Sequence, residues 1–545
     1  MYNVFTMVKS MNMVKTANSA SVLVKTLVEL GVESIFGYPG AAVLSIYNEL
    51  SKTEKIKHYL VRHEQAAVHA AEGYARVCGR AGVVLITSGP GFTNTVTGIA
   101  NAFADSTPLV VLAGDVPSTN KQGKIFQNVD IESIVGSCCK KVYTLKHDDD
   151  VAQIMKLAFN EAMSGVKGPV VVALPRNILE AEYHARKSVA AIEENQKNDY
   201  SKEIENLSDL IKKAQRPLVM LGGGCVNASD EVEKFVSKIQ CPVVSTLMGI
   251  GIYPSENRLY LGMIGLNGVD VANTALKQCD LLITLGAGFS DRSTCKNSEF
   301  TKNLKIASIN LQPASKPVDY EIIADIKDFL GEFIKSNTQF IRPEKWLMEI
   351  DSVEDDENDF EDGVSEKLHS SYVLETVSEF TKYFEPVVVT DVGQHQMLTA
   401  QFFNFNKPRK FITSGGLGTM GFGLPASIGA YIANPNSLVL NITGDGSFQM
   451  NLQELATCRE HNIPLKVIIM NNSYLGMVRE LQEKIYNRRY QVEMINPDFT
   501  KIAEAYDLFA VRVETKEELI PALENAISHE GTAIIDVVID SFENI

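Results

Sequence analysis

The chain has 545 residues, of which 45% are hydrophobic and 22% are charged, and its formal net charge is −16 at pH 7. This length predicts about three α/β domains, and the negative charge argues against nucleic acid or an anionic membrane surface as a partner. No apolar run approaches the roughly 18 residues that span a bilayer, and no signal peptide is recognised, so we expect a soluble, cytoplasmic protein.

The first predicted domain covers residues 13–182, and in it helix-like and strand-like segments alternate. Helices are expected at 19–30 and 64–78, and strands at 35–37, 83–87, 109–113 and 170–174. Such alternation predicts a parallel sheet with helices on both faces. The polar stretch from Glu180 to about Asn206 is expected to be a linker.

The second predicted domain covers residues 200–338, with strands expected at 217–221, 242–246 and 281–285. Glycine clusters follow the first and third of these strands, at 222–224 and 286–288. A glycine cluster after a strand indicates either a nucleotide site or a simple tight turn, and the sequence leaves both open. A second linker follows, in which eight of the twelve residues 351–362 are acidic.

The third predicted domain covers residues 367–545 and holds the most informative stretch of the chain. A strand at 438–442 leads into Gly444-Asp445-Gly446, a helix is expected at 452–460, and a strand at 465–470 ends in Asn471-Asn472. In a parallel sheet both strands end at the same edge, so Asp445 and Asn472 are expected to converge there. With a nearby backbone carbonyl, for which we take Tyr474, they suit a Mg²⁺ that also binds phosphate oxygens. The alternative is a turn aspartate and a capping loop.

The spacing of the residues in this stretch is similar to that of a known cofactor-binding motif. Between Gly446 and Asn471 lie 24 residues, and the segment resembles the diphosphate motif of thiamine diphosphate (ThDP) enzymes. More narrowly, residues 444–451 and 471–478 resemble the acetolactate synthase catalytic subunits. The resemblance implies an α/β protein of three doubly wound parallel-sheet domains (pyrimidine-binding, central and diphosphate-binding). It also implies ThDP and Mg²⁺ as cofactors, a homodimer or homotetramer with active sites between subunits, and a possible separate regulatory subunit.

The same resemblance implies roles for individual residues. Glu64 is the expected carboxylate that holds the aminopyrimidine of ThDP in its imino form, although a glutamate at a helix N-terminus is also favoured by the helix dipole. Met420 is expected to prop the cofactor in its bent shape, the alternative being core filler. Phe126, Gln127 and Lys140 are expected to line the substrate channel, and Gln127 and Lys140 count with Glu64 and Met420 as catalytic.

Arg292 is the candidate for binding the acceptor carboxylate, because a guanidinium binds a carboxylate in bidentate fashion. The remaining cofactor-binding residues that the resemblance implies are Tyr38, Pro39, Gly40, Pro90, Asn94, Val392, Gly393, Gln394, His395, Gly418, Gly444, Asp445, Gly446, Ser447, Asn472, Tyr474, Leu475, Gly476, Met477 and Val478.

Some positions depart from the family pattern. Leu481 stands where relatives that prefer 2-oxobutyrate have a tryptophan, Phe92 where the family usually has alanine, and Asp115 where it has glutamine. These changes either reshape the acceptor pocket or are neutral in packing.

Other departures concern FAD, which many relatives bind without using its redox chemistry. Val166, Gly288, Ser290 and Asn310 replace charged residues expected to contact it, and each lost charged hydrogen bond is worth about 1.5–3 kcal/mol. FAD is therefore possible but doubtful.

The expected activity is that of a ThDP- and Mg²⁺-dependent decarboxylating carboligase, condensing two pyruvate into 2-acetolactate and CO2. In an alternative, the same pyruvate-derived acyl group is transferred to an aldehyde or a keto-sugar. A rival of another class is a non-catalytic partner or a plain nucleotide-binding module, against which the joint presence of Glu64, Asp445 and Asn472 argues. The eight cysteines show no metal-binding or Cys-x-x-Cys spacing, and we expect buried, reduced thiols.

Overall fold

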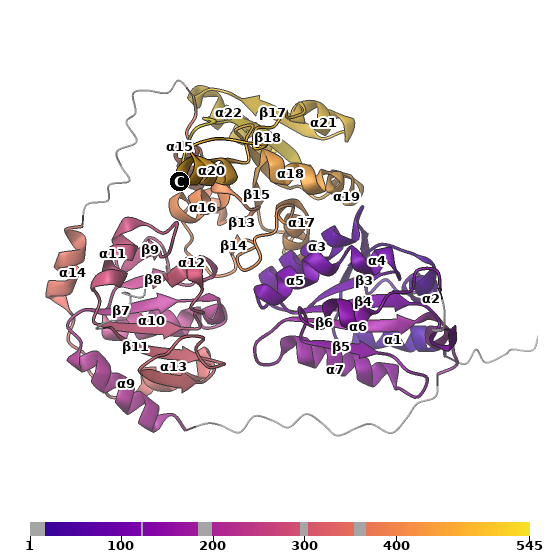
Figure 1. The fold of residues 1–545 in the computed structure, drawn as a ribbon, viewed down its shortest axis with the longest axis horizontal. Coiled ribbons are helices and arrows are strands. Elements are labelled where there is room, and N and C mark those ends of the chain that lie inside the picture. The colour runs from indigo at the N-terminus through magenta and orange to yellow at the C-terminus, as the bar shows by residue number, and fades with distance from the viewer. Residues whose placement is uncertain (1–16, 121–123, 184–198, 295–303, 354–366) are drawn as a thin grey trace, which may run out of the picture.

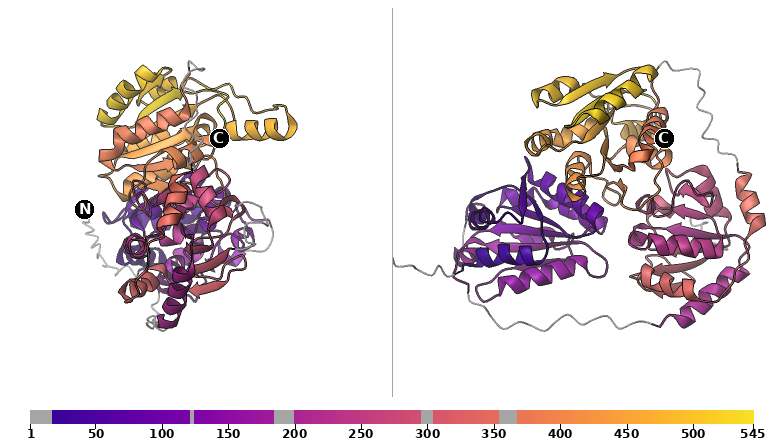
Figure 2. Two further views of the ribbon diagram at one scale, coloured as in Figure 1. Left: turned by 90° about the vertical axis from the view of Figure 1, so that its left-hand side faces the viewer. Right: turned by 180° about the vertical axis from the view of Figure 1, so that it is seen from behind.

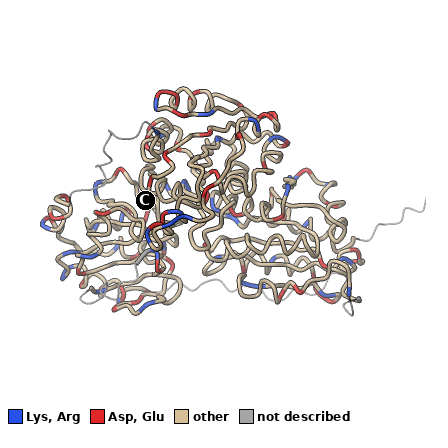
Figure 3. Tube along the Cα trace, turned by 45° about the horizontal axis from the view of Figure 1, so that its top comes forward, with Lys and Arg blue, Asp and Glu red and all other residues tan. Residues whose placement is uncertain are grey.

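The computed structural model describes residues 17–120, 124–183, 199–294, 304–353 and 367–545. Within them the chain forms three six-stranded sheets, and all neighbouring strands with described pairing run parallel. Figure 1 shows the third unit above the first and the central units. Acidic and basic residues are interspersed over all three (Figure 3). The predicted three-domain α/β architecture is confirmed.

The first sheet has the strand order β2-β1-β3-β4-β6-β5. Its strands are β1 (Ser34–Gly37), β2 (Lys57–Leu60), β3 (Gly82–Ile86), β4 (Leu109–Asp115), β5 (Lys141–Thr144) and β6 (Pro169–Pro175). Its helices are α1 (Ser19–Glu29), α2 (Leu44–Leu50), α3 (Glu64–Cys78), α4 (Pro90–Thr93), α5 (Val96–Ala104), α6 (Ile131–Val135), α7 (Val151–Met163) and α8 (Arg176–Leu179). Successive strand residues point to opposite faces, so Val83 and Leu85 pack in one core with α1 and α7, whereas Val84 and Ile86 pack in another with α3 and α5.

The central sheet has the order β12-β11-β10-β7-β8-β9, which read from the other end is the 3-2-1-4-5-6 order of doubly wound dinucleotide-binding sheets. Its strands are β7 (Pro217–Leu221), β8 (Val243–Ser245), β9 (Tyr260–Met263), β10 (Leu281–Leu285), β11 (Lys305–Asn310) and β12 (Tyr320–Ile323). Its helices are α9 (Ser201–Lys213), α10 (Ser229–Ile239), α11 (Asp270–Gln278), α12 (Asp291–Thr294), α13 (Ile326–Lys335) and α14 (Glu344–Asp351).

The third sheet repeats the connectivity of the first, with the order β14-β13-β15-β16-β18-β17. Its strands are β13 (Val387–Thr390), β14 (Phe411–Ile412), β15 (Val439–Gly444), β16 (Lys466–Asn471), β17 (Phe509–Val513) and β18 (Ala533–Val538). Its helices are α15 (Ser370–Thr381), α16 (Gln394–Phe402), α17 (Gly423–Ala433), α18 (Asp445–Asn451), α19 (Leu455–His461), α20 (Gly476–Tyr486), α21 (Phe499–Ala505) and α22 (Lys516–Ser528).

Two expectations about local structure need correction at their boundaries. The helical segment expected at 452–460 is present as a 3₁₀ turn at Leu452–Glu454 followed by α19, but a further helix, α18, precedes it and starts at Asp445 directly after the strand. The polar stretch expected to be a linker up to Asn206 already turns into α9 at Ser201, because one side of that helix packs its apolar residues on the central core. Residues 184–198 and 354–366 of the two expected linkers lie outside the described residues.

The first and third domains are joined by a close contact of α3 with α17. A Cβ atom added to Gly73 would lie 2.0 Å from the carbonyl oxygen of Ala426, and one added to Gly429 would lie 1.7 Å from that of Ala70. The two helices therefore touch backbone to backbone, which only glycine permits at these positions.

One helix of the third domain stands apart from the rest. Figure 2 shows α20 projecting from the body of the molecule, and its apolar residues Leu481 and Ile485 are 52% and 63% exposed. No helix in the described part of the chain is long and apolar enough to cross a membrane.

Candidate active site

The third sheet changes winding direction between β13 and β15, because β14 follows β13 on one side and β15 adds on the other. Open α/β sheets bind ligands at such a switch point, beyond the carboxyl ends of the strands. Asp391 to His395 follow β13, Asp445 follows β15, and Asn472 follows β16. The sheet thus gathers the predicted diphosphate residues of this domain at one edge.

Asp445 is buried at this edge, and its carboxylate accepts three hydrogen bonds. One carboxylate oxygen accepts from the backbone N–H of Gly446 at 2.9 Å, and the other accepts from Ser473 N–H and from Asn496 Nδ2, both at 2.7 Å. Burial raises the pKa of Asp445 to about 6. A buried carboxylate held in this way is suited to a cation, which would offset the cost of burying its charge.

Asn472 lies in the neighbouring loop and is fixed by its own backbone. Its Oδ1 accepts from the N–H of Tyr474 at 2.9 Å, and its Nδ2 donates to Oε1 of Gln394 at 3.4 Å. Gly476 lies so close to Gln394 that an added Cβ would be 1.8 Å from Oε1. The loops after β13 and β16 are therefore packed together, and a larger residue at 476 would have to displace the side chain of Gln394.

His395 lies between the loops after β13 and β15. A Cβ added to Gly393 or to Gly444 would lie 3.0 Å from its ring, and burial lowers its pKa to about 4, so the ring is neutral. Its Nε2 is buried and has no hydrogen-bond partner among the described residues. Ser447 Oγ donates to the carbonyl of Val392 at 3.0 Å and ties the same two loops. An unsatisfied polar nitrogen at a switch point fits a site that takes a polar ligand.

The donor set fits Mg²⁺ better than a softer metal. In the described part of the chain, no three His, Cys, Asp or Glu residues gather as a metal site. Asp445 supplies the one carboxylate, and Asn472 Oδ1 and the carbonyl of Tyr474 are the further oxygens nearby in sequence. Mg²⁺ is commonly held by one or two carboxylates, with waters and substrate phosphates in its other positions.

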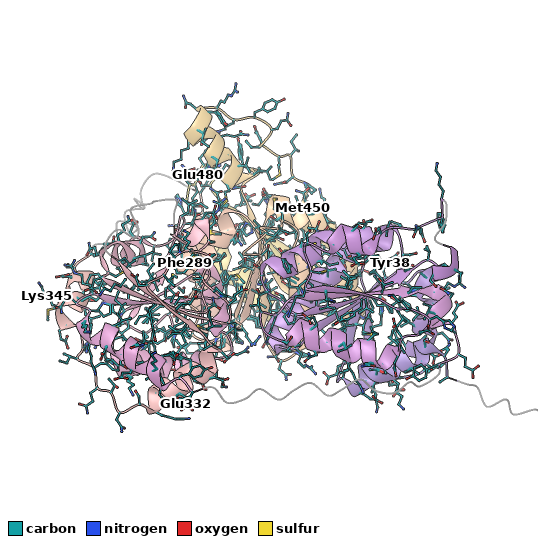
Figure 4. The ribbon with its side chains drawn as sticks, turned by 60° about the horizontal axis from the view of Figure 1, so that its bottom comes forward. Tyr38, Phe289, Glu332, Lys345, Met450 and Glu480 are labelled. Atoms are coloured by element: carbon teal, nitrogen blue, oxygen red, sulfur yellow. The ribbon has the colours of Figure 1, made fainter. Side chains whose placement is uncertain are left out.

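The first sheet has the same switch point, between β1 and β3. Tyr38-Pro39-Gly40 follow β1, and a Cβ added to Gly40 would lie 2.5 Å from the side chain of Thr87, which follows β3. Figure 4 labels Tyr38 in this domain and Met450 on α18 of the third domain.

Glu64 begins α3 at the same edge of the first sheet. Its Oε2 accepts from Asn94 Nδ2 at 2.9 Å, and Pro90 begins the helix α4 that leads to Asn94. Gln127 has a left-handed backbone with φ of 60°, and an added Cβ on Gly89 would lie 2.7 Å from its Cβ. The structure therefore brings Glu64, Pro90, Asn94 and Gln127 together, as the resemblance implies, and Phe126 beside them is 85% exposed.

Lys140 does not join this group. It precedes β5, and its N–H donates to the carbonyl of Pro169 at the start of β6, so it lies at the opposite, amino edge of the sheet. Its ammonium donates to the carbonyls of Glu161 and Ser164 at 2.5 and 2.8 Å. At the carboxyl edge Arg176 directly follows β6, and sequence reasoning did not single it out.

The first-domain departures Phe92 and Asp115 are buried, whereas the departure Leu481 and the candidate site residues Arg292 and Met420 are at least partly exposed. Phe92 is fully buried in the core of the first domain, so it is a packing residue and lines no pocket. Asp115 is also buried, and one of its oxygens accepts from the N–H of Val116. Leu481 on α20 and Arg292 on α12 are exposed. Met420 is half-buried and follows Gly418, whose φ of 73° is left-handed.

Two further polar residues support the site and carried no signal in the sequence. Asn496 bonds both Asp445 and the side chain of Asn471, at 2.7 and 2.9 Å. Glu454 is fully buried, and its Oε1 accepts from the backbone N–H groups of Arg62 and His63, just ahead of Glu64, at 2.9 and 3.1 Å. Each contact joins segments that are far apart in the sequence.

The glycine clusters of the central domain meet at its own switch point. An added Cβ on Gly222 would lie 2.3 Å from Cα of Ala287, and one on Gly224 would lie 2.8 Å from Cα of Gly286. Asn310, at the end of β11, turns its side chain back to the N–H of Leu311. These glycines allow the backbones of the loops after β7 and β10 to pass close to each other.

Comparison with known families matches all three domains. Residues 17–134 match the model for the thiamine pyrophosphate enzyme N-terminal TPP binding domain, residues 204–333 the central domain, and residues 391–537 the C-terminal TPP binding domain.

Similar proteins match almost the whole chain. The acetolactate synthase large subunit of Haemophilus influenzae is 37% identical over 97% of this chain and 96% of its own length. The acetolactate synthase isozyme 3 large subunit of Escherichia coli is 38% identical over 97% and 96%. A probable acetolactate synthase large subunit of Methanocaldococcus jannaschii is 37% identical over 96% and 92%.

Proposed function

Because the chain belongs to the thiamine pyrophosphate enzymes, among the acetolactate synthase large subunits, we propose that it is the catalytic subunit that condenses two pyruvate into 2-acetolactate and CO2. One observation carries this proposal: two equivalent switch points, on the first and third sheets, gather Glu64 with Asn94 and Asp445 with Asn472. These are the two halves that a ThDP site needs.

Asp445, Oδ1 of Asn472 and the carbonyl of Tyr474 would hold Mg²⁺, and Gln394, His395 and the loops after β13 and β15 would hold the diphosphate. Gly393, Gly444 and Gly476 allow the close approach of these loops. Bound there, thiamine diphosphate supplies the electron sink that lets a 2-oxoacid lose CO2 and its acyl carbons attack an acceptor carbonyl.

Glu64 holds a proton against the ring nitrogen of the aminopyrimidine, and Asn94 orients that carboxylate through the 2.9 Å hydrogen bond. Gln127 and the exposed Phe126 would line the approach of the substrate, and the half-buried Met420 would contact the cofactor from the third domain. Lys140 is left out of this set, because its ammonium is bound at the opposite edge of the sheet.

The assembly that this site requires is a homodimer or a homotetramer, with Glu64 of one subunit facing the diphosphate site of another. The exposed apolar residues Phe126, Leu481 and Ile485 support such contacts. The relatives are named large subunits, which supports a separate regulatory subunit as a further partner. A cytoplasmic location is in keeping with the cysteines, all of which are free in the described part of the chain.

Leu481 is exposed on the projecting helix α20, where a leucine leaves a wider pocket than tryptophan would, so an aldehyde or keto-sugar acceptor is the second candidate. Tight FAD binding is not proposed, because Gly288, Ser290 and Asn310 offer no charged partner at the carboxyl edge of the central sheet. Flavin absorbance released from the denatured protein would contradict this.

The test is an incubation of the purified protein with ThDP, Mg²⁺ and pyruvate, in which pyruvate loss and acetolactate formation are followed together. Acetolactate is expected in step with pyruvate consumption. The Glu64→Gln variant is expected to bind ThDP and Mg²⁺ but to form no product, since only its proton-holding group is changed. Pyruvate consumption without acetolactate would favour the second candidate, and no ThDP binding by the wild type would refute the proposal.

A further inference from the structure

Four polar side chains of the first domain form a buried cluster where α3 and α5 meet the third domain. Glu72 and Arg76 lie on α3, Asn101 lies on α5, and Asp105 follows α5. The side chains of Glu72, Asp105 and Arg76 are 0%, 1% and 12% exposed, and Asn101 is fully buried. All of these but Glu72 bond directly to one segment of the third domain, residues 413–419, which leads to Met420.

Asp105 binds the backbone of this 413–419 loop. Its Oδ2 accepts from the N–H of Gly415 at 3.0 Å, and its Oδ1 accepts from the N–H of Gly416 at 2.6 Å. A Cβ added to Gly416 would lie 2.9 Å from Oδ1 of Asp105, so the carboxylate lies directly against a glycine backbone. Arg76 bonds the same carboxylate at 2.6 Å and keeps it oriented.

Asn101 binds the two ends of the loop. Its Nδ2 donates to both oxygens of Glu72 at 3.0 and 2.9 Å, which fixes the amide so that Oδ1 faces the third domain. That Oδ1 accepts from Ser414 Oγ at 2.5 Å and from Thr419 Oγ1 at 2.9 Å. Ser414 Oγ also accepts from the N–H of Thr419 at 2.8 Å, so the loop is closed on itself.

Arg76 completes the cluster by donating to the carbonyl of Thr413 at 2.6 Å, in addition to its bonds with Glu72 and Asp105. One cation thus lies between two buried carboxylates. Such buried ionic groups are weak evidence for stability, because their desolvation can exceed their attraction. The α3–α17 contact already joins the domains through Gly73 and Gly429 and does not require these charges.

The bonds of the cluster go to an irregular loop. Its own domain holds only the start of this loop, where Gln396 of α16 donates to Thr413 Oγ1 at 2.7 Å and to the carbonyl of Ser414 at 3.0 Å, whereas Asp105 and Asn101 bond the residues that follow, Gly415, Gly416 and Thr419. Within the loop Gly418 has a left-handed backbone, and Met420 follows two residues later. We propose that Asp105 and Asn101 are positioning residues: they hold the 413–419 loop, and through it Met420, in the geometry that shapes the bound cofactor. This inference rests on the proposed function, because Met420 is assigned to the cofactor there.

The test compares Asp105→Asn with Asp280→Asn in the full-length holoenzyme. Asp280 is a matched control, since its carboxylate also accepts from two successive backbone N–H groups, those of Gln215 and Arg216, but in the central domain. At saturating ThDP and Mg²⁺, Asp105→Asn is expected to lower kcat by about 10- to 100-fold, as expected for a displacement of about 1 Å near the reacting atoms. The near-ultraviolet circular dichroism of the bound cofactor is expected to change, while the Mg²⁺ requirement set by Asp445 stays the same.

Thr419→Val is the second variant, for the case that Asp105→Asn does not fold. It removes one hydroxyl bond to Asn101 at nearly constant volume, and the same changes are expected to a smaller degree. A lower thermal stability with wild-type kcat and wild-type cofactor dichroism in the folded variants would overturn the positioning role. A wild-type protein that binds no ThDP would refute the proposed function as well, so the two failures are distinguishable.

Discussion

Glu454 gives a quantitative test of how the first and third domains are joined. Burial raises its pKa from 4.5 to about 7, although Thr457 and the N–H groups of Arg62 and His63 partly offset this. A shift of one pKa unit corresponds to about 1.36 kcal/mol, so the ionised carboxylate costs the folded state roughly 3 kcal/mol at pH 8. Because the folded pKa lies above the unfolded one, stability is greatest below pH 4.5 and falls as the pH rises towards 7.

The variant Glu454→Gln is expected to remove this cost without losing a hydrogen bond. Its Oε1 can keep both backbone N–H groups, and its amide can donate to Thr457 Oγ1, which already donates to the carbonyl of Leu60. We expect a stabilisation of about 2–3 kcal/mol at pH 8 but only about 1 kcal/mol at pH 5, where the unfolded chain is itself partly protonated.

The assay is thermal unfolding of the protein without cofactors, at pH 5 and pH 8. For a domain of this size, about 1 kcal/mol shifts Tm by about 2–4 °C, so we expect a rise of roughly 4–12 °C at pH 8 and at most about 4 °C at pH 5. Glu460→Gln is the matched control: this carboxylate also pairs with Arg62 but is exposed, so its replacement is expected to change little. An equal shift at both pH values, or a destabilisation at pH 8, would refute the reasoning.

Two further substitutions test the packing of α3 on α17 and the support of the metal site. Gly429→Ala is expected to destabilise the protein by about 3 kcal/mol or more, measured by thermal unfolding, because its Cβ would lie 1.7 Å from the carbonyl oxygen of Ala70. Gly331→Ala is the control, because a Cβ added there would have no described atom within 4 Å, and it is expected to stabilise α13 by about 0.5–1 kcal/mol. A similar loss of stability in both variants would contradict the backbone contact between α3 and α17. Asn496→Ala is expected to weaken Mg²⁺ binding about 10- to 100-fold, measured by titration calorimetry in the presence of ThDP, because it removes one of the two hydrogen bonds that orient Oδ2 of Asp445. An unchanged affinity would argue against the metal assignment.

The sequence predicted regular elements well where both ends carry a chemical signal. The helix expected at 64–78 has the same bounds in the structure, since His63 caps its N-terminus and Gly79 ends it with a φ of 74°. The first helix after the strand at 438–442 was expected at 452, but α18 already starts at Asp445. Gly444 and Gly446 on either side of Asp445 are typical of a turn, so the sequence did not indicate that a helix starts here with Gly444 as its N-cap.

Contacts between distant segments could not be predicted in this way. Asn496 and Glu454 act on Asp445 and on the backbone ahead of Glu64, and no local pattern connects these positions. Lys140 was assigned to the site because of its position in the sequence. Sequence position alone does not determine at which edge of the sheet a residue lies. The edge is decided by the pairing of β5 with β6.

The contact of Gly73 with Ala426 also has a consequence for the order in which the protein is made. About 350 residues separate the two helices in the chain, and at roughly 5–20 residues per second the ribosome needs about 20–70 s to synthesise them. During that time the face of α3 that will meet α17 has no partner from its own chain. The nascent first domain therefore exposes an apolar, glycine-containing surface until the third domain has been synthesised.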